Sequence, residues 1–250
     1  MDSGLEGKVA LVSGATRGIG RAVALGLARE GVAVAVAWRR DEAIAGAIVA
    51  EIERGGGRAI AVQLDQREPA SIAHAVAQTR RVLGGITVLV ANAVAWPDGG
   101  AAESVALARS LATNAVGTFA LVEAALPFMR ESGWGRIVLI SSDVVGQPTD
   151  GDLAYAGAKA AIEGIGRVLA VGEARHGILT NIVRPGLTLT EKALEAAPAA
   201  VIAFEKQETP TGRLSTAEDV ASAVVYLASA ANGNVNGQTL SVAGGRELKR

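Results

Sequence analysis

Short, continuous apolar runs alternate with longer helix-forming segments along almost the whole chain. The runs are rich in Val, Ile, Leu and Ala without polar–apolar alternation, so each strand is expected to be buried on both faces. Regular alternation with short connections predicts right-handed βαβ units. The fold class is therefore α/β: a Rossmann-type doubly wound parallel sheet of about seven strands, with helices on both faces. The expected strands are 8–12, 32–38, 59–64, 86–91, 136–141, 178–183 and 238–242, and the expected helices are 19–30, 41–54, 69–83, 103–130, 153–175, 190–206 and 217–228.

Length and composition are those of one globular unit. The chain has 250 residues without a linker, low-complexity run or internal repeat, so residues 1–250 are expected to form a single domain. Half of the residues are apolar, which allows a sizeable core. Residues 187–210 depart from the regular alternation and are expected to be an insertion whose loops shape a substrate site.

Several classes of function are disfavoured by composition. Cysteine is absent and the two histidines, His74 and His176, lie in different helical segments, so no metal site is expected. The formal net charge is −1 without a basic stripe, which argues against a nucleic-acid partner. No apolar run approaches the roughly 18 to 20 residues of a membrane span. Residues 1–8 do not resemble a signal peptide, and a cytoplasmic location without a membrane partner is expected.

A glycine-rich turn at residues 13–20 joins the first expected strand to the first expected helix. Its spacing is G-x-x-x-G-x-G rather than the more widely known G-x-G-x-x-G. In this position the free N–H groups and the positive dipole end of the helix favour phosphate, although a purely structural turn is the alternative. The candidate dinucleotide-binding residues of the turn are Gly14, Thr16, Arg17, Gly18, Ile19 and Gly20.

The second expected strand ends in Trp38-Arg39-Arg40, where a doubly wound fold faces the adenosine ribose. An acidic residue there would bind the 2′-hydroxyl of NAD, but this chain has arginines. The guanidinium groups of Arg39 and Arg17 suit a 2′-phosphate, so NADP(H) is favoured over NAD(H). The alternative is a solvated turn with Asp41. Asp65, after the third strand, is expected either to bind the adenine amine or to cap the next helix.

Candidate proton-transfer residues gather in the second half of the chain. Tyr155 and Lys159 are four apart, which places them on one face of a helix. The lysine ammonium favours tyrosinate, which would bring the phenol pKa toward a working range for acid–base chemistry. Ser142 ends the fifth expected strand, 13 residues before Tyr155, and is placed to hydrogen-bond a substrate carbonyl. Asn114, a poor helix former within a long helix, is expected to hold a water near Lys159.

With these features the chain resembles the short-chain dehydrogenase/reductase family from Lys8 to Gly245. The resemblance rests on the glycine turn, on Asn114, Ser142, Tyr155 and Lys159, and on the P-G-x-x-x-T element that ends at Thr190. It implies that Tyr155 exchanges a proton with the substrate oxygen, that Ser142 stabilises that oxygen, and that Lys159 lowers the Tyr155 pKa and binds the nicotinamide ribose. Asn114 would complete a water-linked relay.

The resemblance also implies further cofactor contacts and shows a departure. The residues that it adds are Asn92, Pro185, Gly186, Thr188 and Thr190, beside Tyr155 and Lys159. The family usually has glycine where this chain has Val94, so the rim of the site is expected to be altered without loss of binding.

The function that we expect is an NADP(H)-dependent ketoreductase, similar to the 3-oxoacyl-[acyl-carrier-protein] reductases or to a secondary-metabolite ketoreductase. Its partner would be a small-molecule carbonyl or alcohol substrate, either free or carrier-linked. The alternatives are a non-catalytic dinucleotide-binding regulator and a lyase or epimerase on the same fold. The resemblance further implies a homotetramer or homodimer, with 103–130 and 153–175 as candidate interface helices.

Overall fold

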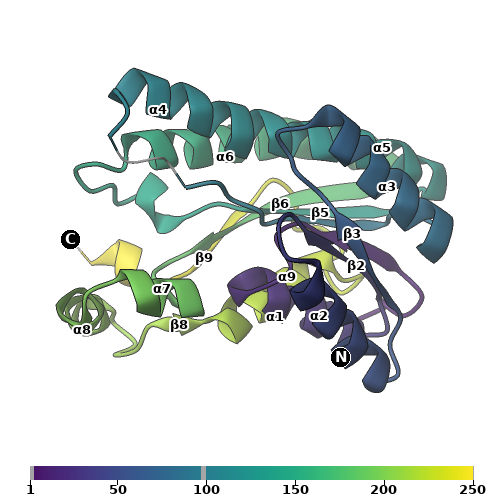
Figure 1. Cartoon of the computed structure of the whole chain (residues 1–250), viewed down its shortest axis with the longest axis horizontal. Helices are drawn as coiled ribbons and strands as arrows, with labels where there is room; N and C mark the ends of the chain where they lie inside the picture. The colour runs from purple at the N-terminus through teal and green to yellow at the C-terminus, as the bar shows by residue number, and fades with distance from the viewer. Residues whose placement is uncertain (1–2, 97–99, 250) are drawn as a thin grey trace.

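A seven-stranded parallel sheet in the order β3-β2-β1-β4-β5-β6-β9 forms the centre of the chain (Figure 1). The computed structural model describes residues 3–96 and 100–249. Every neighbouring pair of strands in this sheet is parallel. The order reverses between β1 and β4, which creates the crevice where doubly wound sheets bind ligands. The strands are β1 Val9–Val12, β2 Ala33–Trp38, β3 Ala59–Gln63, β4 Val88–Ala91, β5 Gly135–Ile140, β6 Ile178–Pro185 and β9 Thr239–Val242.

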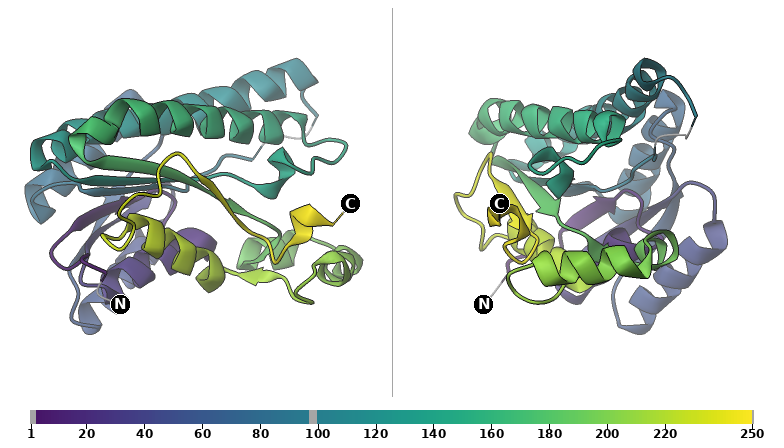
Figure 2. Two further views of the ribbon diagram at one scale, coloured as in Figure 1. Left: turned by 180° about the vertical axis from the view of Figure 1, so that it is seen from behind. Right: turned by 90° about the vertical axis from the view of Figure 1, so that its left-hand side faces the viewer.

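Helices cover both faces of the sheet, as Figures 1 and 2 show. Strand β2 illustrates why helices are needed on both faces of the sheet. Its residues Val34 and Val36 pack into the core beneath α1, α2 and α9. Its residues Ala33 and Ala35 pack into the core beneath α3, α5 and α6. The predicted doubly wound fold is therefore confirmed. The helices are α1 Gly18–Arg29, α2 Glu42–Arg54 and α9 Ala217–Ala228 on one face, and α3 Pro69–Leu83, α4 Glu103–Ser110, α5 Gly117–Ser132 and α6 Leu153–Glu173 on the other.

Local sequence signals set several helix ends. The Asp41 carboxylate accepts a hydrogen bond from the Ile44 N–H at 3.1 Å, which caps the start of α2. The same helix ends at Arg54, immediately before the three glycines. Pro69 occupies the first turn of α3, where its missing N–H costs nothing.

Two expected helices are divided in the structure. The segment expected at 103–130 contains a π-helical turn, η1 Leu111–Val116, between α4 and α5. The segment expected at 190–206 forms α7 Glu191–Ala196 and α8 Ala199–Glu208. The break follows from Pro198, because a residue before proline, here Ala197, favours extended backbone.

Shorter elements complete the chain and were not predicted. A small two-stranded parallel sheet joins β7 Thr188–Leu189 to β8 Ser215–Thr216. Three 3₁₀ turns lie at η2 Asp143–Val145, η3 Ala174–His176 and η4 Arg246–Leu248. Together β7, α7, α8 and η4 build one wall beside the carboxyl ends of the strands (Figure 2).

Candidate active site

The glycine turn brings the start of α1 against two neighbouring segments. A side chain at Gly20 would overlap the carbonyl oxygen of Gly14, so only glycine lets the helix start this close to the turn. Gly18 has a φ of +51°, and a Cβ there would lie 3.0 Å from the Thr190 Cγ2. The backbone of the turn is therefore exposed beside Thr190, in the arrangement that binds a diphosphate.

Asn92 secures this turn from the neighbouring strand. Its side-chain amide donates to the carbonyl oxygens of Ser13 and Gly14, both at 3.1 Å. The Ser13 hydroxyl accepts the N–H groups of Asn92 and Ala93 at 3.0 Å. The predicted role of Asn92 as a cofactor-site residue thus has a structural basis: it holds the turn in shape.

A cleft of about 970 Å³ runs along this edge of the sheet. Its size suits an extended dinucleotide. Its walls come from the glycine turn, the ends of β2, β3 and β4, the second half of α4 with the following η1, and α7. Val94, which stands where the family usually has glycine, is part of its rim. The predicted cofactor residues that line it are Gly14, Thr16, Arg17, Gly18, Ile19, Gly20, Arg39, Asp65, Asn92 and Thr190.

Three arginines line the cleft, namely Arg17, Arg39 and Arg40. Within residues 3–96 and 100–249 none of the three forms an ion pair. Acidic side chains lie nearby as well, since Asp41 and Asp65 line the same cleft. A guanidinium group without an ion pair is well suited to bind a phosphate.

Asp65 forms an ion pair within its own loop. Its carboxylate accepts hydrogen bonds from the Arg67 guanidinium, including Nε at 2.9 Å, and from the Arg67 N–H at 3.1 Å. These contacts lower the pKa of Asp65 to about 2. The side chain caps no N–H of α3, whose N-cap residue is Glu68, so the expected helix cap is wrong. Asp65 lines the cleft, and its contact with the adenine amine stays a prediction.

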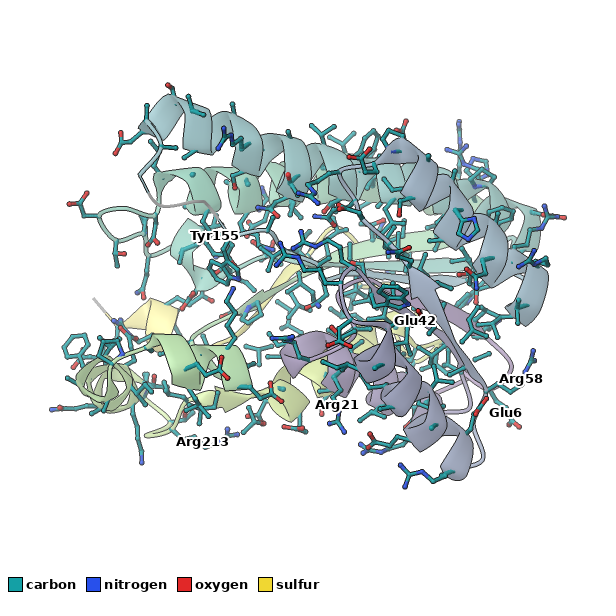
Figure 3. The ribbon with its side chains drawn as sticks, in the orientation of Figure 1. Glu6, Arg21, Glu42, Arg58, Tyr155 and Arg213 are labelled. Carbon is teal, nitrogen blue, oxygen red and sulfur yellow. The ribbon has the colours of Figure 1, made fainter. Side chains whose placement is uncertain are left out.

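Tyr155 projects from α6 toward α7 (Figure 3). Burial raises the pKa of its phenol to about 12, a hydrogen bond with Ser142 opposes this rise, and the charges of Asp143 and Asp152 add to it. The Ser142 hydroxyl also lies 3.3 Å from Asp143 Oδ1. Burial in turn raises the pKa of the Asp143 carboxyl. Ser142 thus lies beside Tyr155, as predicted.

Lys159 is almost fully buried, and its predicted effect on Tyr155 is not found. Its ammonium donates to the Ile140 carbonyl oxygen at 2.7 Å and lies 5.7 Å from the centroid of the Tyr155 ring. Burial lowers the Lys159 pKa to about 8. Burial disfavours the charged forms of both groups, and no contribution of Lys159 to the Tyr155 pKa is found in the protein without cofactor. The predicted lowering of the Tyr155 pKa with cofactor bound stays a prediction.

Asn114 lies in the π-helical turn and is buried. Its amide oxygen accepts the Ala95 N–H at 2.7 Å, and its amide nitrogen donates to the Ala95 carbonyl at 2.8 Å and to the Ser110 hydroxyl at 3.1 Å. Both amide N–H groups are therefore used. The side chain anchors the segment after β4. Because its amide N–H groups are occupied, a proton relay through Asn114 would have to use the backbone of this residue.

Pro185, Gly186 and Thr188 lie beside the cleft and do not line it. The Thr188 hydroxyl donates to the Gly186 carbonyl at 2.9 Å, and Thr188 pairs with Ser215 in the small sheet. These residues fix the course of the chain between β6 and α7. They thereby place Thr190 against the glycine turn.

A buried charge network supports the catalytic helix from behind. Glu163, one turn after Lys159 on α6, accepts two hydrogen bonds from the Arg184 guanidinium at 3.0 and 2.8 Å. It also accepts the hydroxyl of Ser141, the residue before Ser142, at 2.8 Å. Arg184 reaches Glu247 of η4 at 3.0 Å. The network therefore joins α6, β5, β6 and the C-terminal turn.

Sequence reasoning missed one part of the site. Lys192 lines the cleft from α7 and lies over the Trp96 ring, which itself stacks on Tyr155. The sole signal for Lys192 was a cation two positions after Thr190. Among the described residues no cluster of His, Cys, Asp and Glu could hold a metal ion.

Comparisons with known proteins agree with this geometry. A family model described as Enoyl-(Acyl carrier protein) reductase matches residues 14–247. An L-rhamnose 1-dehydrogenase (NAD(P)(+)) of Sphingomonas sp. strain SKA58 is 36% identical over 245 residues, 96% of each chain. A 3-oxoacyl-[acyl-carrier-protein] reductase of Pseudomonas aeruginosa is 36% identical over 252 residues, 96% of this chain and 98% of that one.

A solved structure shows the same likeness. A 7α-hydroxysteroid dehydrogenase complexed with NADH and 7-oxo glycochenodeoxycholic acid is 30% identical, with a TM-score of 0.92 over 98% of this chain and 96% of that one. The named substrates of these relatives differ widely, and the two whose descriptions name a cofactor, the L-rhamnose 1-dehydrogenase and the 7α-hydroxysteroid dehydrogenase, name a nicotinamide cofactor.

Proposed function

Because the chain belongs to the short-chain dehydrogenase/reductase family and is an oxidoreductase, we propose that it transfers a hydride between NADP(H) and a ketone or secondary alcohol. The observation that carries the choice of cofactor is that three arginines, Arg17, Arg39 and Arg40, line the cleft and form no ion pair within the described residues. No acidic residue ends β2, where NAD-binding chains place one for the ribose 2′-hydroxyl. A guanidinium fork instead matches a 2′-phosphate.

The shape of the cleft fits a dinucleotide. The glycine turn would hold the diphosphate, the arginines the 2′-phosphate, and Thr190 the nicotinamide end. A nicotinamide cofactor supplies or accepts the hydride. The protein then has to provide or remove a proton at the substrate oxygen.

Tyr155 is the proton donor in this proposal, with Ser142 and Lys159 beside it. A phenol whose pKa is raised to about 12 is fully protonated at neutral pH, which is the form that reduction of a carbonyl requires. Ser142, hydrogen-bonded to Tyr155, would hold the same substrate oxygen. The Lys159 ammonium, fixed by Ile140, would supply positive charge as the phenol gives up its proton.

Cofactor choice is tested by titrating NADPH and NADH into the protein and following nicotinamide fluorescence. We expect NADPH to bind at least about tenfold more tightly, because a charge-assisted guanidinium–phosphate contact contributes at least the binding free energy that corresponds to a tenfold affinity difference. Arg39→Met should remove most of the difference. Arg29→Met, at the far end of α1 from the glycine turn, is the matched control. Equal affinities in the wild type would refute the preference for NADP(H).

The reaction is tested with Tyr155→Phe. We expect it to lose turnover by about a hundredfold or more while NADPH affinity is retained, because the ring stays and only the proton donor is lost. Unchanged turnover in the variant would refute the proton-transfer role. If a broad carbonyl panel gave no NADPH oxidation in the wild type, a binding-only regulator or a lyase or epimerase would be the better reading.

The substrate class that we propose is a ketone, with 3-oxoacyl thioesters as the first choice. A relative of the chain is a 3-oxoacyl-[acyl-carrier-protein] reductase, and α7 and α8 form the wall beside the site. A panel of acyl thioesters, sugar lactones, polyols and steroid ketones, followed by NADPH consumption or formation, distinguishes thioester reduction from sugar or steroid oxidation.

We further infer that the protein assembles as a homodimer or homotetramer through α4–α5 and α6. Large apolar side chains are exposed on these helices, among them Val116, Val168 and Val171. In the described part of the chain, Glu103–Ser132 is the one helix long and apolar enough to span a membrane, and only 39% of its most apolar window is buried. A second copy of the chain would cover this apolar surface.

A further inference from the structure

Three side chains form a stack across the mouth of the site. The Trp96 and Tyr155 rings have centroids 4.7 Å apart and planes inclined by 26°. The Lys192 ammonium lies on the Trp96 ring, 4.3 Å from its centroid. Trp96 follows β4, Tyr155 lies on α6 and Lys192 on α7, so the stack joins opposite walls. Trp96 and Lys192 line the cleft, and the stacked indole covers one face of the Tyr155 ring.

Lys192 has a second set of neighbours in the same cleft. Arg17, in the glycine turn, and Lys192 both line the cleft. Partial burial and then the charge of Arg17 lower the Lys192 pKa. Glu191 and Glu195 also line the cleft, yet no ion pair of Lys192 occurs within the described ranges 3–96 and 100–249. Two cations beside a phosphate-binding turn form a site for an anion.

The contact with Trp96 is the weaker of the two that Lys192 can make. A cation–π contact at a partly exposed site contributes less than a charge-assisted hydrogen bond to a phosphate oxygen. A diphosphate at the glycine turn would therefore draw the ammonium toward Arg17. Trp96 would then lose the cation on its outer face, and its stacking on Tyr155 would rest on the ring contact alone.

We propose that Lys192 is a cofactor-binding residue that exchanges the Trp96 ring for the diphosphate of the dinucleotide, and that this exchange uncovers Tyr155. The inference rests on the proposed dinucleotide function, but it does not depend on NADP(H), because NAD(H) carries the same diphosphate. It gives the protein an order of events: the cofactor binds first, and the substrate oxygen then gains access to the phenol.

Binding is tested with ligands that contain only part of the cofactor. Lys192→Met should raise the dissociation constant of ADP-ribose, which has the diphosphate, about tenfold. It should leave that of adenosine 2′-monophosphate, which lacks the diphosphate, unchanged. Lys192→Arg should retain ADP-ribose binding, since a guanidinium also binds phosphate. Lys206→Met, on α8 and outside the cleft lining, is the matched control.

The outcomes separate this inference from the choice of cofactor. Unchanged ADP-ribose binding in Lys192→Met would overturn the role of Lys192. An Arg39→Met variant that binds adenosine 2′-monophosphate as well as the wild type does would overturn the preference for NADP(H) and leave the role of Lys192 standing.

Uncovering of Tyr155 is tested by tryptophan emission. Adding ADP-ribose to the wild type should change the emission of Trp96, because its ring leaves the stack. The ligand itself does not disturb the measurement, since ADP-ribose absorbs no light in the tryptophan emission range. Trp38 also lines the cleft, and its part of the ligand-induced emission change is measured in the Trp96→Phe variant. Lys192→Met should show part of the shifted emission before any ligand is added. An identical ligand-induced change in the wild type and in Trp96→Phe would overturn the uncovering step.

Discussion

Single side chains in the site owe their proton affinities chiefly to burial. The Tyr155 phenol and the Lys159 ammonium both lie out of water, and in each case the uncharged form is favoured. For the phenol this means a firmly held proton, and for the lysine a proton that is more easily lost. With these pKa values both groups keep their protons near neutral pH, and Lys159 is the one that loses its proton under mildly alkaline conditions.

This burial makes folding stability depend on pH through Lys159. The pKa is about 8 in the folded chain and 10.5 as the ordinary value, so the unfolded chain binds more protons between these limits. The contribution of Lys159 to the free energy of unfolding therefore rises with pH across that window, by on the order of 3 kcal/mol. Urea unfolding of the wild type and of Lys159→Met at pH 7 and pH 10 measures it. The difference between the two proteins should change with pH, and parallel behaviour would contradict the buried, charge-disfavouring site.

The shifted proton affinities also show where sequence reasoning stops at the residue scale. The four-residue spacing of Tyr155 and Lys159 correctly placed them on one helix. The sign of the Tyr155 shift depends on the burial of the phenol, which comes from distant segments including the Trp96 ring stacked on it. Likewise Asn114 was singled out correctly as unusual in a helix, but its partner Ala95 comes from another segment.

Whole elements were predictable where the signal is local. Helices α3 and α9 match their expected bounds, and the strands match closely, because proline, glycine and apolar periodicity act within a few residues. The π-helical turn η1 was missed, because a poor helix former such as Asn114 does not by itself indicate which helical geometry a segment adopts. The pairing of β7 with β8 was missed because it joins short segments far apart in sequence.

At the scale of elements, Glu163 holds α6 to the end of β6 and to the loop that carries Ser142. It is buried with Arg184, Ser141 and Arg167 around it. Glu163→Ala leaves the largely buried Arg184 without its main partner, so we expect a loss of about 3 kcal/mol in the free energy of unfolding. Urea denaturation measures this loss, with Glu123→Ala, an exposed change on α5, as the control. A loss as small as that of the control would show that the network does not stabilise the fold.

The whole molecule presents an unusual surface on the side that α4, α5 and α6 occupy (Figure 1). Val168 and Val171 are 73% and 84% exposed, and their spacing of three places them on one face of α6. Exposed apolar side chains of this density on a long helix are typical of an interface. Glu163, on the same helix, accepts a hydrogen bond from Ser141, the residue before Ser142, so the proposed interface and the proposed catalytic residues would share α6.

Assembly through this face predicts a change in molar mass. The double variant Val168→Glu/Val171→Glu places two charges where apolar contacts are expected, and burying unpaired charges there would be too costly for association. We expect wild-type protein to elute at the mass of two or four chains in light scattering coupled to size exclusion, and the variant to elute at the mass of one. Val82→Glu, an exposed valine on α3, is the control and should keep the wild-type mass. A single-chain mass for the wild type would refute the interface, as would an unchanged multi-chain mass for the double variant. Because α6 also carries Tyr155, a monomeric variant that retains NADPH binding but loses turnover would show that the catalytic end of the helix needs the interface to hold its position.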